Sequence, residues 1–421
     1  MVAGSRSSTF RDSRGPRAEA MLLDALTLQL GYNATLVAIG ASLLGMAAGV
    51  TGTFVFLRKR ALVSDAISHA TLPGVALAFI LLVALGGDGR ALPGLLAGSA
   101  VSAGLGLLAV QALTSRTRLA EDAAIGAVLS VFCGFGVVRL TVVQGMSSGR
   151  QAGLEDFLLG STAGMLRADA VVIAVGGALA LALVLILRRP MTLVAFDRDF
   201  ATATGVDTRR IDIAMMGLVL AVTVVGLKIV GLIMIVALLI IPPVTARFWS
   251  DRSDHVALLA GAIGGAAGFL GAAVSATAPA LPTGPIIVLL AFAAFVMSLL
   301  LSPRRGVLAA VLRRRRYQRR VHRRQGLLAL AQGQTIYEDF TRGLLIRERL
   351  MRPDGVPTEA GRAAAARALL DEQRWAILRS DRRYDVAASR YDGLAGVASV
   401  LTADQLRDID ARLAPPAGVQ S

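Results

Sequence analysis

The stretch from Leu62 to Leu85 constrains this chain most, because it has the length of a membrane helix yet contains ionisable side chains. It reads LVSDAISHATLPGVALAFILLVAL, and roughly 20 apolar residues suffice to cross a bilayer. Asp65 and His69 are four residues apart, so on a helix they lie on one face, about one turn from each other. An ionisable group inside a membrane helix costs on the order of 2.5–3.5 kcal/mol and usually faces a cavity or a partner.

A carboxylate and an imidazole together are suitable ligands for a divalent transition metal. We therefore take as a hypothesis that Asp65 and His69 line a metal path. A purely structural interpretation stays open. Asp65 follows the basic run Arg58-Lys59-Arg60 closely, so it could cap a helix or pair with an arginine, and His69 could bond to a backbone carbonyl.

Long apolar stretches continue from about Asn33 to Ser302, so the sequence predicts an all-α polytopic membrane protein. The run 211–246 has no clear loop in its middle, so eight spans remain an alternative to nine. Pro242-Pro243 is expected to break its span near the cytoplasmic end. The expected spans are 33–57, 62–85, 93–113, 122–143, 169–187, 211–228, 229–246, 256–276 and 284–302.

The distribution of arginines predicts which ends of the spans lie in the cytoplasm. Alternate connections are basic, and the positive-inside rule places them in the cytoplasm, with the N-terminus outside and the C-terminus inside. Four arginines within the first 20 residues argue mildly against this orientation. The first 20 residues lack the apolar segment of a signal peptide. Residues 1–32 are expected to be poorly ordered.

The connection between residues 188 and 210 carries a distinct pattern. Asp197 to Ala203 is expected to form a short helix closed by Gly205. Phe196 and Phe200 are four residues apart and would share a face of it. Such a helix is either a turn at the membrane interface or a docking element that binds a cytoplasmic partner.

Two further places interrupt the apolar pattern. Lys228 falls near the middle of the run 211–246, where a snorkelling side chain is the ordinary explanation. The last span opens with Pro282, Gly284 and Pro285, and irregular backbone at membrane depth is tolerated only where it lines a cavity or is buried in protein. Small residues, as in Gly45–Gly49, permit close packing of membrane helices.

Several motifs, taken together in their order and spacing, resemble the membrane permeases of bacterial ABC importers for manganese, zinc and iron. The resemblance runs through most of residues 33–302. The motifs are Gly52–Arg58, Leu62–Gly74, Glu121–Gly126, Leu154–Gly160, Phe196–Ala201 with Gly205, Leu227–Gly231, Ile241–Arg247 and Pro282–Pro285.

The resemblance implies roles for particular residues and about eight or nine helices of the metal-importer permease type. Asp65 and His69 correspond to positions expected to contact or gate the transported Mn²⁺, Zn²⁺ or Fe²⁺. The segment with Phe196, Asp197, Phe200, Ala201 and Gly205 corresponds to the coupling helix that docks into the ATPase. Further structural or pathway candidates are Pro73, Gly74, Lys228, Pro242, Gly284 and Pro285.

The resemblance also implies an assembly in the bacterial inner membrane. It comprises two permease chains, identical or paralogous, a dimer of cytoplasmic ABC ATPase chains and an extracytoplasmic metal-binding protein. This chain has no G-x-x-x-x-G-K-[ST] phosphate loop, so a separate subunit is expected to hydrolyse ATP. No tightly bound cofactor is expected. Two copies of the Asp65/His69 pair near a dimer axis would suit Mn, Zn or Fe(II).

The tail after Ser302 is charged. Residues 303–325 form a basic linker, expected to contact anionic lipid, with nucleic-acid binding as the alternative. Residues 326–421 are expected to form a small, mainly helical cytoplasmic domain. Its stretches Gly355–Ala365 and Leu401–Leu406 weakly resemble a C-terminal extension of some manganese/iron permeases that is related to the winged-helix region of iron-dependent repressors. No histidine follows His322, which argues against metal sensing.

Two other classes of function were weighed against a transporter. A membrane-anchored regulatory protein with an Arg-rich tail that binds nucleic acid or another partner would need only one or two spans. An intramembrane metalloenzyme would normally have three protein ligands and a general base, as in H-E-x-x-H. The chain has three histidines and no such motif.

Overall fold

The computed structural model describes residues 32–87, 91–145, 167–277 and 281–413. The chain divides into two compact units, Met1–Val307 and Leu308–Ser421. Apart from Tyr32, the expected N-terminal segment 1–32 lies outside the described residues, as does the motif Leu154–Gly160.

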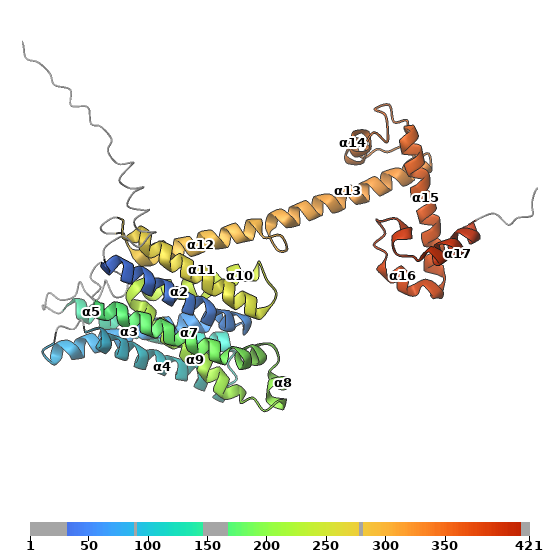
Figure 1. Ribbon diagram of the computed structural model, residues 1–421. Coiled ribbons are helices and arrows are strands. Elements are labelled where there is room, and N and C mark those ends of the chain that lie inside the picture. The colour runs from blue at the N-terminus through green and yellow to red at the C-terminus, as the bar shows by residue number, and fades with distance from the viewer. Residues whose placement is uncertain (1–31, 88–90, 146–166, 278–280, 414–421) are drawn as a thin grey trace, which may run out of the picture. The chain divides into compact units, whose positions relative to one another are not determined.

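The first unit is a bundle of helices that run alongside one another (Figure 1). Eight of them are long and apolar enough to cross a membrane, and α10 is a shorter apolar helix, so the expected polytopic all-α fold is confirmed. One or two anchoring spans would not account for this bundle. The helices are α2 (Tyr32–Leu57), α3 (Ala61–Ala84), α4 (Leu92–Arg116), α5 (Glu121–Gln144), α7 (Arg167–Phe196), α8 (Arg198–Ala203), α9 (Thr208–Val230), α10 (Leu232–Arg247), α11 (Ser253–Ser275) and α12 (Thr283–Leu301).

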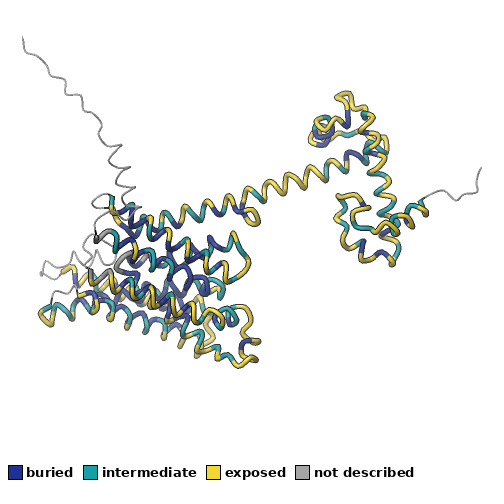
Figure 2. Tube along the Cα trace, viewed as in Figure 1, coloured by how far each residue is buried: buried dark blue, intermediate teal, exposed yellow. Residues whose placement is uncertain are grey.

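Helix α2 lies at the centre of the bundle, in contact with α7, α9, α10 and α11, and buried residues concentrate there (Figure 2). Its small residues let α11 approach closely. A Cβ atom on Gly45 would lie 2.2 Å from the carbonyl oxygen of Gly264, and a Cβ atom on Gly264 would lie 2.2 Å from that of Gly45. The small-residue pattern therefore does predict close packing here.

Helix α7 is longer than the expected span 169–187. It continues through Pro190 to Phe196, although a proline removes one backbone hydrogen bond. Packing compensates, because Met191 lies in the main apolar core and Val194 in the last turn is also buried. The expected end of this span at residue 187 was therefore wrong.

The expected break at Pro242-Pro243 was also wrong, because α10 runs on to Arg247. Pro243 has no N–H for the carbonyl of Leu239, four residues earlier. That carbonyl instead meets Gly52 of α2, where an added Cβ atom would lie 1.9 Å from the oxygen. The hydroxyl of Thr245 donates to the carbonyl of Ile241 at 2.7 Å, which gives the helix a further local bond.

The second unit is helical, with α13 (Val307–Ala331), α14 (Asp339–Arg347), α15 (Glu359–Ser380), α16 (Asp385–Arg390) and α17 (Ala403–Leu413). It holds two small apolar clusters. One lies around Leu345, and the other lies around Leu378. A capping box opens α17, as its sequence predicts, since the Thr402 N–H donates to the Gln405 side chain at 3.0 Å and the Gln405 N–H donates back at 3.4 Å.

The stretch that was expected to be a basic linker, 303–325, lies mostly within α13. The described residues of the second unit contain no β-strand, only the isolated bridge between Met351 and Pro357. A winged helix carries a β-hairpin as its wing. The weak resemblance to repressor domains is therefore not supported by this structure.

Candidate functional site

Asp65 and His69 lie together on α3, as their spacing predicts. Nε2 of His69 is 3.5 Å from Oδ1 of Asp65, and the two side chains keep 26% and 39% of their surface exposed. Helix α3 continues without a break through Pro73, and it packs against α4, α5, α9 and α10. A carboxylate and an imidazole are thus held side by side within the apolar bundle.

Among the described residues, Asp65 neither caps a helix nor pairs with an arginine of the basic run, and His69 does not bond to a backbone carbonyl. Arg58 pairs with Asp212, and Arg60 pairs with Glu121 at 3.0 Å, so neither arginine is bound to Asp65. Asp65 does not cap α3, whose N-cap position is Arg60. Nδ1 of His69 is buried and has no hydrogen-bond partner, so it is not satisfied by a carbonyl.

Other buried polar atoms near the centre of the bundle also have no partner among the described residues. They are the hydroxyls of Thr51 on α2, Ser68 on α3 and Thr223 on α9. These three helices contact one another. A buried polar atom without a partner costs about 1–3 kcal/mol, and such atoms in a native structure call for an explanation, such as a missing water or ion. Each of these hydroxyls is available to water or to an ion.

Within the described residues, no third His, Cys, Asp or Glu joins Asp65 and His69 in a cluster that could hold a metal. One chain therefore offers two donors at this position. Asp254 and His255, the other adjacent acid and histidine, lie exposed at the start of α11.

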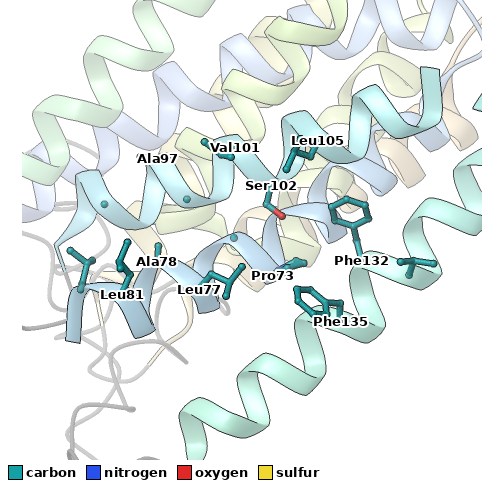
Figure 3. Close-up of a pocket in the computed structure, with 15 residues that line it drawn as sticks. Pro73, Leu77, Ala78, Leu81, Ala97, Val101, Ser102, Leu105, Phe132 and Phe135 are labelled. Carbon is teal, nitrogen blue, oxygen red and sulfur yellow. The ribbon is translucent and has the colours of Figure 1, made fainter. Parts of the chain in front are cut away.

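Pro73 and Gly74 lie on α3 beside an apolar surface. They line an apolar groove of about 660 Å³ between α3, α4 and α5, in which Ser102 is the single polar side chain (Figure 3). A Cβ atom on Gly74 would lie 2.1 Å from the carbonyl oxygen of Gly98. Gly74 thus allows α3 and α4 to pack closely.

The long apolar run 211–246 is divided by a single residue. Gly231 has φ +84° and ends α9 where α10 begins, a conformation that glycine adopts without strain. Gly284 packs against this break, since a Cβ atom there would lie 2.2 Å from the carbonyl oxygen of Val230. Lys228 belongs to α9, one turn before the break, and its side chain lies outside the described residues.

Pro285 is compatible with a helix because it occupies the first turn of α12, where a missing N–H leaves no helical bond unmade. The turn before α12 is held by Ser275, whose hydroxyl donates to the carbonyl of Leu281 at 2.8 Å. The irregular backbone expected here is therefore a helix start, packed against the break at Gly231.

The expected short helix between α7 and α9 is confirmed as α8, at one end of the bundle (Figure 1). Asp197 caps its start by accepting a hydrogen bond from the Phe200 N–H at 2.8 Å. Gly205 at φ +84° closes it, and the N–H of Val206 donates to the carbonyl of Ala201 at 3.0 Å in a Schellman motif.

Helix α8 presents its aromatic side chain outward and its small one inward. Phe200 keeps 54% of its surface exposed, whereas Ala201 is fully buried. Phe196 is also exposed, but it is the last residue of α7, so the two phenylalanines come from different helices and the expected i, i+4 face was wrong.

An ion-pair cluster fastens α8 to the bundle. Arg58, directly after α2, binds Asp212 of α9, with Nη1 2.6 Å from Oδ1, and the two side chains keep only 9% and 14% of their surface exposed. Arg198 of α8 reaches the other oxygen of Asp212 at 3.1 Å. Asp212 therefore links three helices through one carboxylate.

Comparison with known proteins decides the family. The sequence profile of the ABC 3 transport family matches residues 32–302, which is nearly the whole described part of the first unit.

The chain belongs to the ABC 3 transport family.

Two bacterial relatives and one solved structure are similar to this ABC 3 chain. The manganese transport system membrane protein MntC of Bacillus subtilis is 38% identical over 325 residues, 77% of this chain and 72% of the relative. The zinc transport system membrane protein TroC of Treponema pallidum is 38% identical over 285 residues, 68% of this chain and 94% of the relative. PsaBC from Streptococcus pneumoniae, solved in complex with Fab, has a TM-score of 0.58 and 29% identity, covering 68% of this chain and 97% of that one.

The similarity to MntC is not confined to the membrane unit. Its 325 matched residues exceed the 302 residues that precede the tail, so part of the tail resembles MntC as well. The tail of this ABC 3 chain is thus shared, at least in part, with a manganese transport protein.

The sequence did not single out Asp212, Arg58 and Arg198 as a cluster. Asp212 falls at the start of the expected span 211–228 and was given no role, and Arg58 was read only as part of a basic run at the cytoplasmic side. A signal was present, because Asp212 is the one acid inside the otherwise apolar stretch that follows Arg210. Its partner Arg58 lies 154 residues away in sequence, and only the fold brings the two together.

Proposed function

We propose that this chain is the permease subunit of an ABC importer that moves a divalent transition metal, manganese, zinc or iron, across the inner membrane of a bacterium. The observation that carries the proposal is the Asp65–His69 pair, held 3.5 Å apart inside the bundle of an ABC 3 family chain. Manganese and zinc appear in the names of the relatives. Both donor types suit these ions.

The pair would act as half of a transient metal site. A second copy of this chain, or a paralogue, would add its own carboxylate and imidazole near a common axis and complete a four-donor set. Four donors of this kind bind Mn, Zn or Fe(II), and affinity order alone does not choose among them. Without a thiolate the set binds less tightly than a Cys-rich site, which favours release of the transported ion.

Helix α8 would couple this path to ATP hydrolysis in a separate ABC ATPase dimer. The exposed Phe200 is available for docking, and Phe196 lies exposed at the end of the preceding helix. The Arg198–Asp212–Arg58 cluster connects α8 to α9 and α2, so a displacement of α8 reaches the bundle through a stiff contact. The permease itself would hydrolyse no ATP.

The remaining parts of the assembly follow the same proposal. An extracytoplasmic metal-binding protein would deliver the ion on the outer side. Residues 326–421, which follow the basic segment 303–325, would lie in the cytoplasm because of the arginines of α13.

Uptake of radioactive manganese and zinc tests the metal path. The full chain is expressed with its ATPase and binding protein in cells, beside Asp65→Asn, His69→Ala and the double variant. We expect each substitution to abolish uptake while the abundance of the protein in the membrane stays unchanged. The preferred isotope then identifies the metal.

The exposed pair at the start of α11 supplies a matched control. Asp254→Asn with His255→Ala removes the same two chemical groups from the protein surface and should leave uptake unchanged. Normal uptake by the Asp65 and His69 variants would overturn the proposed path, although membership of the family would stand.

A further inference from the structure

The second unit contains a cavity of about 420 Å³ whose walls are basic. It lies between the last turns of α13, the first half of α15 and the loop before Val397. Its volume is in the range of pockets that hold small molecules. The charged side chains that line it are Arg320, Arg323, Arg324, Arg367 and Asp371.

Two of the four arginines are already engaged. Arg323 binds Glu348 with Nε 2.6 Å from Oε2. Arg324 binds Glu372 at 2.7 Å and also donates to the hydroxyl of Tyr391 at 2.8 Å. These contacts hold the guanidinium groups of Arg323 and Arg324 in place, since each makes a charge-assisted hydrogen bond.

The other two arginines have no counter-charge in contact. Arg320 and Arg367 form no hydrogen bond or ion pair with any residue that the structure describes. The single acid of the wall, Asp371, lies 3.7 Å from Arg374, so its charge is partly offset. The cavity therefore carries an excess of positive charge.

The carboxylate of Asp392 also has hydrogen-bond partners of its own. Asp392 accepts hydrogen bonds from the N–H groups of Leu394 and Ala395 at 2.9 and 3.0 Å. These bonds, with a smaller contribution from the charge of Arg320, hold the pKa of Asp392 below its usual range. Asp392 is committed to its own loop and leaves Arg320 available.

The shape of the cavity suits a compact anion. Arg320 and Arg324 are four residues apart on α13 and lie on one face, opposite Arg367 on α15. Ala364, Ala368 and Gly396 line the space between them with little bulk. Guanidinium groups present paired N–H donors that match the oxygens of a phosphate.

We propose that this cavity binds a phosphate group, with Arg320 and Arg367 as the principal ligands. Arg324, which Glu372 and Tyr391 hold in place, lies beside them. The phosphate belongs to a soluble small molecule or to a lipid headgroup, and both offer anionic phosphate oxygens. Nucleic acid fits less well, because the site is a small concavity rather than an extended basic surface.

The tryptophans give a direct test. Trp375 packs on Tyr391, with ring centroids 4.7 Å apart, and Tyr391 accepts the hydrogen bond from Arg324. In a Trp249→Phe chain, Trp375 is the only tryptophan left. We expect its fluorescence to change saturably when inorganic phosphate or ATP is added to this chain in nanodiscs of zwitterionic lipid.

Charge-neutralising variants show where the anion binds. Arg320→Gln with Arg367→Gln should weaken binding about tenfold or more, because two charge-assisted hydrogen bonds are lost. Arg314→Gln with Arg315→Gln removes the same charge from exposed positions of α13 outside the cavity and should change affinity little. Equal weakening by both double variants would show non-specific attraction and overturn the site.

A second arm separates the two sources of phosphate. Nanodiscs that contain phosphatidic acid are compared with zwitterionic ones, without added phosphate. A headgroup ligand would change the Trp375 signal only in the anionic discs, and the Arg320/Arg367 variant would abolish that change. If neither free phosphate, nor ATP, nor the anionic lipid gives a response that this variant removes, the proposal is wrong.

Discussion

Arg58 and Asp212, which are 154 residues apart in the chain, form an almost buried ion pair with 2.6 Å between Nη1 and Oδ1. Arg58 lies at the point where α2 ends, and Asp212 lies in the first turns of α9. Arg58 also donates to the carbonyl of Val194 in α7 at 3.4 Å. The pair thus ties together the ends of three membrane helices next to α8.

Removing the charge of Asp212 should destabilise the protein. Asp212→Asn leaves Arg58 without a full counter-charge in a nearly buried position, and we expect a loss of about 2–3 kcal/mol in the free energy of unfolding. Thermal unfolding of the purified chain in detergent measures this change.

The control for Asp212 lies on the same helix. Arg210 pairs with Asp207, but the Arg210 side chain is 86% exposed. Arg210→Gln should therefore shift stability by less than about 1 kcal/mol. Equal losses in the two variants would show that burial of the Arg58–Asp212 pair has no energetic consequence.

Truncation of Phe200 should separate docking from folding. Because its side chain is largely exposed, Phe200→Ala should leave the melting temperature unchanged. Under the proposed function it should reduce co-purification of the ATPase and metal uptake together. Ile186→Ala, an exposed hydrophobic truncation on α7, should change neither quantity. Unchanged ATPase binding by Phe200→Ala would contradict the coupling role.

The contact between α2 and α11 leaves no room for a methyl group. In Gly264→Ala the new Cβ atom would lie 2.2 Å from a backbone oxygen, so the helices must separate. We expect a loss of about 1–3 kcal/mol, as for other overpacked cores, measured by thermal unfolding.

Gly104 on α4 provides the comparison, because nothing lies within 4 Å of a Cβ atom placed there. Gly104→Ala should leave stability unchanged or raise it by up to about 1 kcal/mol, since alanine favours the helix. If Gly264→Ala were as benign as Gly104→Ala, the close backbone approach would be disproved.

The second unit should lose stability in acid. Hydrogen bonds from Arg383 and Arg412 lower the pKa of Asp381, and a hydrogen bond from the Tyr384 hydroxyl lowers the pKa of Asp408. A carboxyl whose pKa falls on folding stabilises the fold above its unfolded value of about 3.9, and this contribution disappears as pH drops through the folded value.

Trp375 fluorescence in the Trp249→Phe chain follows this unit. Asp408→Asn should lower its unfolding temperature at pH 7, and the difference should shrink as pH falls below about 4, where Asp408 itself becomes protonated. A difference that stays constant down to low pH would show that Asp408 acts by packing rather than by charge.

The sequence by itself determined much of the first unit. The lengths of the apolar runs predicted the membrane helices, the Asp65–His69 spacing placed both groups on one face, and Asp197 with Gly205 predicted α8. These predictions succeed because helix length, side-chain period and caps are local properties of the chain.

Only the tertiary structure decided the rest. The sequence predicted a span that ends at residue 187 and a break at Pro242-Pro243, whereas α7 continues to Phe196 with Met191 buried and α10 continues to Arg247. The Arg58–Asp212 pair and the basic cavity of the second unit join residues from separate helices. The energies that hold these features come from packing and charge contacts between distant segments, which no local pattern in the sequence encodes.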